Sequence, residues 1–428
     1  MEDSRSQANS ISVLTLGVGA FAHSAGGVLA DNGARVATYL TRAYAHFPPS
    51  LVGPTFDQAQ HPSPLPLLRE RGVQLVLPQS IDWARAPWAD EMLASGAGIL
   101  SPTGEGMRIE RERDFARELC ARFGVPFPRA HVAATRAEAE VILARDRRPF
   151  VIKNPLCSPN SPIHTIVCET VEETRAWLQH VNDAEGVFLQ EYAGRAEAGH
   201  IALVSGGEIV SLVTNQEYKR AFAGNLGIVA GAPLGGIVER DERDRYGLAR
   251  ELLHPLRPWF REVGFHGPIQ VTAAHHEGRW QVLEYNIRIG VTSGAMILRM
   301  LTNPLETLLA ATRNQPLAPR WRDGMAFGAS VTLAGYGYPF TQIVGPPMPI
   351  ETDAAPDGRT CDLWWNEVGR APDGRLLALG HRLADAVGYG ADLPTALARA
   401  YAAIRRVRTT GSYYRNDVGQ SLWPPGNV

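Results

Sequence analysis

The sequence predicts a multidomain protein with both α/β and α+β parts. Three observations lead to this class: a length of 428 residues, strand-like runs alternating with helix-like runs near the amino terminus, and hairpin-like strand pairs further along. A chain of this length exceeds one hydrophobic core, because domains usually hold about 100 to 200 residues. Alternation of strands and helices favours a parallel layer, so we expect a parallel α/β domain first and hairpin-rich domains after it.

Composition argues against several classes of partner. The formal net charge is -2 and the isoelectric point is about 6.6, whereas a nucleic-acid or anionic-membrane surface needs a concentrated basic excess. No apolar run approaches the roughly 18 residues of a membrane span. The first eleven residues are polar and lack the apolar segment of a signal peptide. The four cysteines have no CxxC spacing and are typical of reduced thiols. We expect a cytoplasmic protein that acts on small molecules.

The amino-terminal part is typical of a parallel α/β layer. Its strand-like runs lie at residues 11–16, 35–40, 73–77 and 98–100. The clearest helix-like stretch is 83–95. The turn at Gly17 and Gly19 resembles a dinucleotide-binding turn only loosely, because Ala22 stands where a third glycine is expected. A dinucleotide-dependent oxidoreductase would rest on this turn alone, and the second strand is not followed by a ribose-binding acid.

Helices and strands follow in mixed order through the rest of the chain. Helices are expected at residues 105–123, 134–145, 172–181, 241–263 and 394–406. Strands are expected at residues 149–153, 187–191, 200–204, 209–214, 267–274 and 280–287. Gly206 and Gly207 join two of these strands and are a hairpin signal. Residues 221–236 and the proline- and glycine-rich stretch 345–358 are expected to be irregular.

The run from Gln281 to Gly290 carries the clearest sign of function. Residues two apart in a strand share a face, so Val282, Glu284, Asn286 and Arg288 are expected to point one way. The residues expected to point into a core are Leu283, Tyr285, Ile287 and Ile289. A carboxylate, an amide oxygen and a guanidinium together suit Mg²⁺ and the phosphates it bridges. An ordinary strand with one solvated face would show the same alternation.

Several separate motifs occur in an order that resembles one family. They are Phe150-Val-Ile-Lys153, Gln216-Glu-Tyr-Lys-Arg220, Leu283-Glu-Tyr-Asn-Ile-Arg-Ile-Gly290, Gly380-His-Arg-Leu383 and Gly411-Ser-Tyr-Tyr-Arg-Asn-Asp-Val-Gly419. In this order they are similar to the ATP-grasp superfamily and, within it, to glycinamide ribonucleotide synthetase, the phosphoribosylamine–glycine ligase family. Each motif is short, but their collinearity extends over nearly the whole chain.

The resemblance implies a division into three domains. Residues 1–104 would form an N-terminal parallel α/β domain of the pre-ATP-grasp type, on the substrate side. Residues 105–324 would form a two-lobed ATP-grasp domain, with the smaller lid lobe at about 131–193. Residues 325–428 would form a small, β-rich C-terminal domain.

The resemblance also implies an ATP site. Lys153 would reach the ATP phosphates, where a point charge offsets phosphate charge. Gln190, Glu191 and Tyr192 fall where the family linker reads adenine through backbone groups, and Glu197 lies near the carboxylate that takes the ribose hydroxyls. The plainer structural alternatives are a strand-end lysine whose stem packs on apolar surface and acids in a solvated loop.

A second group of residues is implied in catalysis. Lys219 and Arg220 resemble cations that face the transferred phosphate or the substrate. Arg288 would stabilise an acyl phosphate or anchor a carboxylate. Glu284 and Asn286 would hold Mg²⁺ or Mn²⁺.

The reaction implied by the resemblance is ATP-dependent ligation. A carboxylate oxygen attacks the γ-phosphate, an acyl phosphate forms in a site screened from water, and an amine displaces phosphate to give an amide. The protein contributes mainly positioning and electrostatic stabilisation. The expected partners are a small carboxylate and an amine, without nucleic acid or membrane, and the expected state is a monomer or a weak homodimer.

The substrate side departs from the family pattern. The flap after the lysine strand, Asn154 to His164, contains three prolines and no glycine, so His164 or backbone N–H groups would cover the phosphates. His23 remains from a Gly-Gly-Arg-Glu-His-Ala run, Val291-Thr-Ser293 stands for Asp-Pro-Glu, and Gly227 to Gly236 is more apolar than the family's glycine-rich loop. Loss of polar partners changes specificity steeply.

We therefore expect a less polar acceptor pocket and a different carboxylate, a different amine or both. The alternatives are an authentic phosphoribosylamine–glycine ligase and a non-catalytic ATP-binding protein on the same fold.

Overall fold

The computed structural model describes residues 10–41, 52–158, 161–163, 165–335, 337–339 and 346–420. The described chain divides into two compact units. The first unit comprises described residues within Met1–Ser101, Asn215–Arg240 and Arg288–Ser421. The second comprises those within Pro102–Thr214 and Asp241–Ile287. The expected division into three domains stays a prediction.

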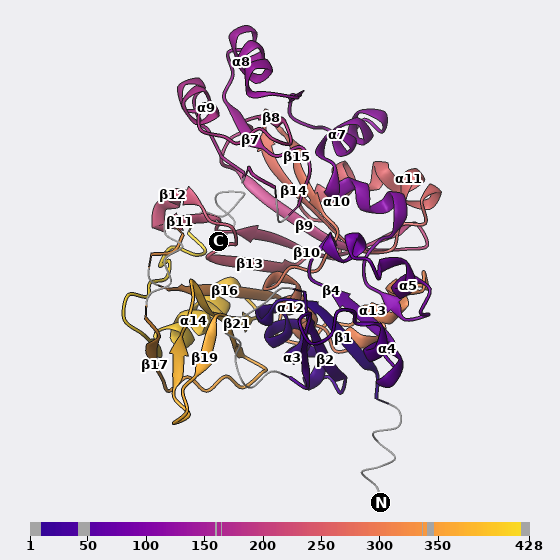
Figure 1. Ribbon diagram of the computed structural model, residues 1–428, viewed down its shortest axis with the longest axis vertical. Helices are drawn as coiled ribbons and strands as arrows, with labels where there is room; N and C mark the ends of the chain where they lie inside the picture. Colours follow the sequence, from indigo (N-terminus) through magenta and orange to yellow (C-terminus); the bar gives the residue numbers. More distant parts are fainter. Residues whose placement is uncertain are drawn as a thin grey trace, which may run out of the picture. The chain divides into compact units, whose positions relative to one another are not determined.

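The first unit begins with a parallel sheet in the order β3-β2-β1-β4-β5 (Figure 1). Its strands are β1 (Ser12–Gly17), β2 (Arg35–Leu40), β3 (Thr55–Asp57), β4 (Leu75–Pro78) and β5 (Gly98–Ile99). All neighbouring pairs run parallel. The burial of nearly every residue of β1, β2 and β4 is typical of strands covered on both faces. The predicted parallel α/β layer is confirmed, and β3 is an addition to it.

Short helices connect these strands. They are α2 (Gly19–Phe21), η1 (Ala22–Gly26), α3 (Gly27–Asp31), α4 (Leu65–Glu70), η2 (Ile81–Arg85) and α5 (Ala89–Leu93). The single helix predicted at 83–95 is wrong, because the chain is extended at Ala86, with φ -71° and ψ 147°. Pro87 follows Ala86 and disfavours the helical conformation for it, so the stretch divides into η2 and α5.

Antiparallel strands form the other part of the first unit. Their order is β13-β16-β21-β18, and all three pairs are antiparallel. The strands are β13 (Gly235–Arg240), β16 (Phe327–Ala334), β18 (Cys361–Trp365) and β21 (Arg382–Gly390). Helix α14 (Leu393–Ile404) packs against β16 and β21, close to the bounds predicted for it. Helices α12 (Ser293–Met300) and α13 (Pro304–Thr312) follow the segment after Arg288.

Two small sheets complete the first unit. One has the order β19-β20-β17-β22, formed by β17 (Met348–Thr352), β19 (Val368–Arg370), β20 (Leu376–Ala378) and β22 (Val407–Arg408). The other is a hairpin of β11 (Arg220–Phe222) and β12 (Leu226–Val229), joined by η4 (Ala223–Asn225). The irregular stretches predicted at 221–236 and 345–358 are therefore partly wrong, since β11, β12, β13 and β17 lie in them; Gly345 itself is outside the described residues.

The second unit contains an antiparallel sheet in the order β15-β14-β9-β10. Its strands are β9 (Glu197–Ser205), β10 (Glu208–Glu217, of which the unit holds residues to 214), β14 (Gly267–His276) and β15 (Arg279–Asn286). The predicted turn between β9 and β10 is confirmed: Gly206 and Gly207 have φ values of 59° and 79°, which residues with a Cβ rarely adopt.

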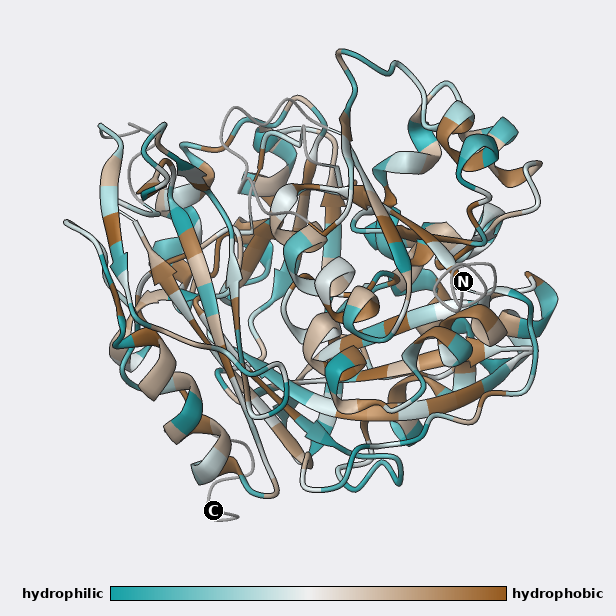
Figure 2. Ribbon diagram, turned by 90° about the horizontal axis from the view of Figure 1, so that it is seen from below, coloured by the Kyte–Doolittle hydropathy of each residue, from teal (hydrophilic) through white to brown (hydrophobic). Residues whose placement is uncertain are grey.

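A smaller sheet in the same unit has the order β6-β8-β7. Its strands are β6 (Ala130–Ala133), β7 (Phe150–Lys153) and β8 (Val187–Glu191), all antiparallel to their neighbours. Helices α8 (Arg136–Arg145) and α9 (Val171–Leu178) pack against these strands and enclose a separate core (Figure 1). Figure 2 shows hydrophobic residues concentrated on strands and hydrophilic residues in many loops.

Two long helices predicted in the second unit are interrupted. The stretch 105–123 divides into η3 (Gly104–Met107), α6 (Arg108–Arg111) and α7 (Arg113–Arg122), because Glu112 is extended, with φ -125° and ψ 105°. The stretch 241–263 divides into α10 (Leu248–Leu252), η5 (His254–Leu256) and α11 (Arg257–Glu262). Pro255 and Pro258 each remove a backbone donor from the second stretch, which explains its division. Within the described residues, no helix has the length and apolar character that crossing a bilayer requires.

A buried ion pair stabilises the first unit. Arg299 on α12 is 5% exposed and donates two hydrogen bonds of 2.9 Å to the carboxylate of Asp362 on β18. The hydroxyl of Tyr389 donates to Asp362 at 3.0 Å, and Arg299 also donates to Asp31 at 2.7 Å. Charged groups with this little exposure are tolerated only when paired, so the pair holds α12 to β18.

Replacing Asp362 by alanine is expected to lower the free energy of unfolding by about 3 to 5 kcal/mol, because the Arg299 charge would remain buried without its main partner. Denaturant unfolding of the purified chain measures this loss. Asp31→Ala is the matched control: it removes the 58%-exposed partner of the same guanidinium and should cost less than about 1 kcal/mol. Equal effects of the two substitutions would contradict this account.

Candidate active site

Lys153 is the buried cation of the second unit. It ends β7, is 4% exposed, and its Nζ donates to Oε1 of Gln190 at 2.6 Å and to the backbone carbonyl of Leu283 at 3.0 Å. Gln190 on β8 is 1% exposed, and its Nε2 donates to the carbonyl of Val282 at 3.1 Å. The ammonium is therefore held between the small sheet and β15. A positive charge with so little exposure has the strength needed to offset phosphate charge.

A bulge in β15 provides one of these acceptors. Thr272 of β14 pairs with Glu284 and Ala273 pairs with Val282, so Leu283 is the extra residue. A bulged residue is unpaired in the ladder, which leaves the Leu283 carbonyl available to Lys153.

The bulge also corrects the predicted faces of this strand. Val282 was expected to share the face of Glu284, but it is fully buried, and Leu283 is only partly buried. The extra residue shifts the alternation by one position, which reverses the faces before it. From Glu284 onward the prediction is confirmed. Glu284, Asn286 and Arg288 are partly exposed, whereas the buried residues are Tyr285, Ile287 and Ile289.

Glu284 and Asn286 lie two residues apart at the end of β15. A carboxylate oxygen and an amide oxygen are ligands that suit Mg²⁺, so the donor set fits this ion. Arg113, the first residue of α7, lies 3.8 Å from Glu284 through Nη1, and its Nε donates to the carbonyl of Asn154 at 2.9 Å. Glu110 is 5% exposed and accepts the backbone N–H of Ile287 at 2.7 Å, which fixes the strand directly after Asn286.

Sequence reasoning missed Arg113 and Glu110. Both lie in the stretch interpreted as one charge-rich helix, where alternating acidic and basic residues are typical of a solvated face. The break at Glu112 separates α6 from α7 and changes which residues face β15. A buried acid among charged neighbours leaves no signal in the sequence.

The predicted nucleotide-linker residues lie at the end of β8 and after it. The backbone N–H of Glu191 donates to the carbonyl of Arg129 at 2.8 Å, and that of Tyr192 donates to Pro149 at 2.9 Å. The Glu191 carboxylate accepts from Arg148 at 3.0 Å. These two N–H groups are already engaged. A backbone hydrogen bond between adenine and Glu191 or Tyr192 would therefore use a backbone carbonyl as the acceptor and an adenine N–H as the donor. Glu197 is half-buried and begins β9, where it pairs with Ala274. The adenine and ribose roles stay predictions.

The other predicted cations belong to the first unit. Lys219 lies 3.6 Å from Glu217 through Nζ, and Arg220 begins β11, where its Nη1 donates to the carbonyl of Gly227 at 2.9 Å. Arg288 is half-buried and follows β15 in the chain. The second unit brings Lys153 and Gln190 into contact and also carries Glu284 and Asn286. Lys219, Arg220 and Arg288 belong to the first unit and are described within it alone.

Two segments that depart from the family pattern, residues 19–24 and 291–293, form hydrogen bonds within the first unit. His23 accepts the backbone N–H of Trp365 through Nδ1 at 2.9 Å, and Ser24 donates to the carbonyl of Val291 at 2.9 Å. Thr292 donates to Asp385 at 3.1 Å. Burial lowers the pKa of His23 from 6.5 to about 4, so the imidazole is neutral at pH 7. His164, which was expected to help cover the phosphates, lies outside the described residues.

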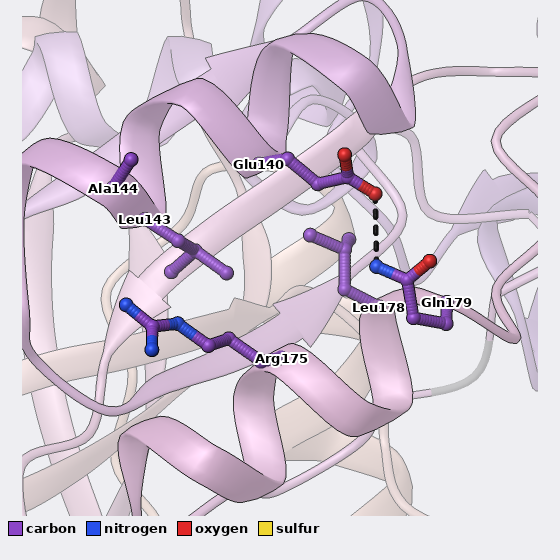
Figure 3. Close-up of a pocket in the computed structure, with 6 residues that line it drawn as sticks. All are labelled: Glu140, Leu143, Ala144, Arg175, Leu178 and Gln179. Atoms are coloured by element: carbon purple, nitrogen blue, oxygen red, sulfur yellow. Dashed lines mark hydrogen bonds between the residues drawn. The ribbon is translucent and has the colours of Figure 1, made fainter.

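Two further features of the second unit bear on the site. His200, Asp241 and Asp244 bring potential ligand atoms within 4.8 Å of one another, but the carboxylates accept backbone N–H groups of Arg245, Ala249 and Arg250 and so order the start of α10. A cavity of about 300 Å³ lies between α8 and α9 (Figure 3). Its lining residues are Glu140, Leu143, Ala144, Arg175, Leu178 and Gln179. None of them is a predicted site residue.

Comparisons with known proteins identify the class. Residues 328–421 match the family model of the phosphoribosylglycinamide synthetase C domain. A phosphoribosylamine–glycine ligase of Leifsonia xyli is 30% identical, and the match covers 77% of this chain and 80% of that protein. The enzyme of the same name from Streptomyces coelicolor is 28% identical, with coverage of 77% and 80%.

Solved structures agree on the fold. The crystal structure of phosphoribosylamine–glycine ligase from Thermotoga maritima has a TM-score of 0.75 and 22% identity, and the match covers 95% of this chain and all of that one. N5-carboxyaminoimidazole ribonucleotide synthetase from Thermus thermophilus has a TM-score of 0.61 and 17% identity, covering 92% of this chain and 98% of that one. The sequence relatives, together with the shared fold, therefore define an ATP-grasp carboxylate–amine ligase. The chain belongs to the phosphoribosylamine–glycine ligase family and is an ATP-dependent ligase.

Replacing Gln190 by leucine is expected to weaken ATP binding about tenfold, because a hydrogen bond to a charged group contributes about 1.5 to 3 kcal/mol and Lys153 would lose its 2.6 Å acceptor. Calorimetric titration with MgATP measures the change. Gln179→Leu, an exposed position on the same lobe, is the control and should bind ATP as the wild type does. Unchanged affinity in Gln190→Leu would contradict the role given to this contact.

The stability of the chain should depend on pH through His23. Between pH 6.5 and about 4 the unfolded chain binds a proton at His23 that the folded chain does not bind, so the free energy of unfolding falls as the pH is lowered through this window. His23→Gln removes this group and should show a shallower fall when denaturant unfolding is measured across the window. Identical slopes in the two proteins would rule out a buried neutral His23.

Proposed function

We propose that this chain joins a carboxylate to an amine through an acyl phosphate, and that at least one substrate differs from phosphoribosylamine and glycine. The observation that carries the ligase part is the buried ammonium of Lys153, held by Gln190 and by the bulge of the strand that ends in Glu284 and Asn286. The Lys153 ammonium contacts β15, and the same strand carries the two oxygen ligands Glu284 and Asn286. This combination suits a nucleoside triphosphate and its metal ion.

The proposed reaction assigns each residue a task. Lys153 would offset charge on the ATP phosphates, and Glu284 and Asn286 would hold Mg²⁺, which would neutralise charge that develops on the phosphates. A substrate carboxylate oxygen attacks the γ-phosphorus and ADP leaves; the amine then attacks the acyl carbon and phosphate leaves. Lys219, Arg220 and Arg288 would stabilise the anionic carboxylate and acyl phosphate.

Contacts in the first unit support a changed substrate. A polyanionic ribose phosphate is best bound by cations and by donors with free hydrogen-bonding capacity. His23 is instead neutral and accepts a backbone N–H, and Thr292 donates to Asp385. Asp385, which is 2% exposed, also accepts from Thr332 and Arg382. These polar groups are engaged in hydrogen bonds within the protein, which favours a less polar substrate.

An authentic phosphoribosylamine–glycine ligase is the second candidate. The names of the relatives favour it, and the Leifsonia xyli enzyme reaches 30% identity. We also propose a cytoplasmic monomer or weak homodimer. Burial raises the pKa of Cys120 to about 12 and that of Cys168 to about 11, which fits unreactive, reduced thiols.

Glu284→Gln is expected to abolish Mg²⁺-dependent ADP release, because the metal would lose its charged ligand; loss of a second-shell partner alone typically costs about 10- to 100-fold in metal affinity. ADP release is measured with phosphoribosylamine plus glycine and with a panel of other carboxylates and amines. Glu118→Gln, on the exposed side of α7, is the control and should leave the rate unchanged.

The same assay separates the two candidates. Turnover with phosphoribosylamine and glycine at a rate comparable to a purine-pathway enzyme would refute the changed substrate and support the second candidate. Wild-type activity in Glu284→Gln would refute the metal site.

A further inference from the structure

The β11–β12 hairpin, residues 220–229, exposes an unusual amount of apolar surface. Phe222 is 42% exposed, Leu226 is 65% exposed and Ile228 is 40% exposed. Of the eight large apolar side chains exposed in the described part of the chain, these three lie within seven residues of one another. Scattered exposed apolar residues need no explanation, but a cluster on one element marks a binding surface.

The backbone conformation of the hairpin determines how these apolar side chains are arranged. Phe222 and Leu226 are cross-strand partners and share a face, and the register shifts between Arg220 and Phe222. Gly227 has φ +79°, and a Cβ at this position would lie 3.0 Å from the Phe222 ring. A side chain at residue 227 would be strained and would displace the ring, so the glycine permits this arrangement of apolar groups.

A buried ion pair anchors the hairpin. Arg415, 1% exposed, donates to the carbonyl of Arg220 and to Oδ1 of Asn225, both at 2.9 Å, and is paired with Asp417 at 2.6 Å. Asp417 also accepts the backbone N–H of Gly224 at 2.9 Å. Removing two charges from water is costly, and a well-attested use of buried ion pairs is to specify one arrangement of the chain. Here the Arg415–Asp417 pair specifies the position of the hairpin.

The C-terminal segment also contacts the apolar surface of the hairpin. The Phe222 ring lies 5.8 Å from the ring of Tyr413. The motif from Gly411 to Gly419 therefore supports the hairpin along its length. Its apolar side chains are held in place at the surface, as expected for a preformed binding surface.

Two cationic residues lie at the start of the hairpin, and one of them, Lys219, is 3.6 Å from Glu217 through Nζ. Lys219 immediately precedes β11, and the guanidinium of Arg220 donates to the carbonyl of Gly227 within the hairpin. A surface with cations at one end and apolar side chains beside them is complementary to a molecule with an anionic head and an apolar body.

We infer that the β11–β12 hairpin binds the apolar body of the carboxylate substrate, and that this substrate is a carboxylic acid with an aliphatic or aromatic side chain. The inference rests on the proposed function, since it takes Lys219 and Arg220 as the cations that face the reacting carboxylate. Glycine, which has no side chain, would leave the hairpin unused.

The test uses the full chain with MgATP and with hydroxylamine as the amine. The carboxylate forms a bond to the γ-phosphorus as the bond to ADP breaks; hydroxylamine then attacks the acyl carbon, phosphate leaves and a proton is lost from nitrogen. Hydroxamate and ADP are measured for acetate, glycine, hexanoate and phenylacetate. The expected result is a kcat/KM for hexanoate and phenylacetate at least about tenfold above that for acetate, in line with burial of several methylene groups.

The double variant Leu226→Ser with Ile228→Ser tests the hairpin itself. It should lower kcat/KM for hexanoate about tenfold while the acetate value and the affinity for MgATP stay unchanged. Leu93→Ser, a 45%-exposed leucine on α5 of the same unit, is the matched control and should behave as the wild type.

Several outcomes would overturn the inference. Equal rates for acetate and hexanoate, or a hexanoate rate unaffected by the double variant, would remove the hairpin from substrate binding and leave the proposed ligase reaction intact. A wild-type dimer that the double variant dissociates in sedimentation velocity would make the hairpin a self-association surface. If MgATP binds but none of the carboxylates supports ADP release, the proposed function and the inference are overturned together.

Discussion

The buried ammonium of Lys153 is the constraint on which the candidate nucleotide site depends. Taking an ion out of water costs several kcal/mol, and this cost is offset only where acceptors are held in good geometry. Gln190 on β8 and the carbonyl of Leu283 on β15 accept hydrogen bonds from this ammonium at 2.6 and 3.0 Å. The small sheet and β15 are therefore linked through one charge, and the register of β7 against β8 pairs Lys153 with Phe188 at the end of the strand.

The bulge at Leu283 serves structure and chemistry together. It supplies a carbonyl outside the β-ladder for Lys153, and it shifts the alternation so that Glu284 and Asn286 lie on the exposed side of the strand end. Glu110 then fixes the backbone at Ile287. Bulges are frequent next to active sites because they re-aim side chains, and this one also gives the Lys153 ammonium an acceptor.

The first unit is organised around other buried charges. Arg299 pairs with Asp362, and Arg415 pairs with Asp417. The first pair joins α12 to β18, and the second joins the C-terminal segment to the β11–β12 hairpin, while His23 is neutral at pH 7. Charge in this unit is thus used to hold elements in place, and the exposed apolar side chains of β11–β12 are available for recognition.

The sequence by itself determined several of the strands, the parallel amino-terminal layer, the β9–β10 turn and the family, because apolar alternation, glycine turns and collinear motifs are local signals. Only the tertiary structure decided the features that depend on pairing with a neighbouring strand or on a break within a helix. The bulge at Leu283 arises from its register with β14, and Arg113 approaches Glu284 because Glu112 interrupts the predicted helix. Arg415, part of a recognised motif, anchors a hairpin that was predicted as a loop. Such contacts join residues far apart in the chain, so no local pattern records them.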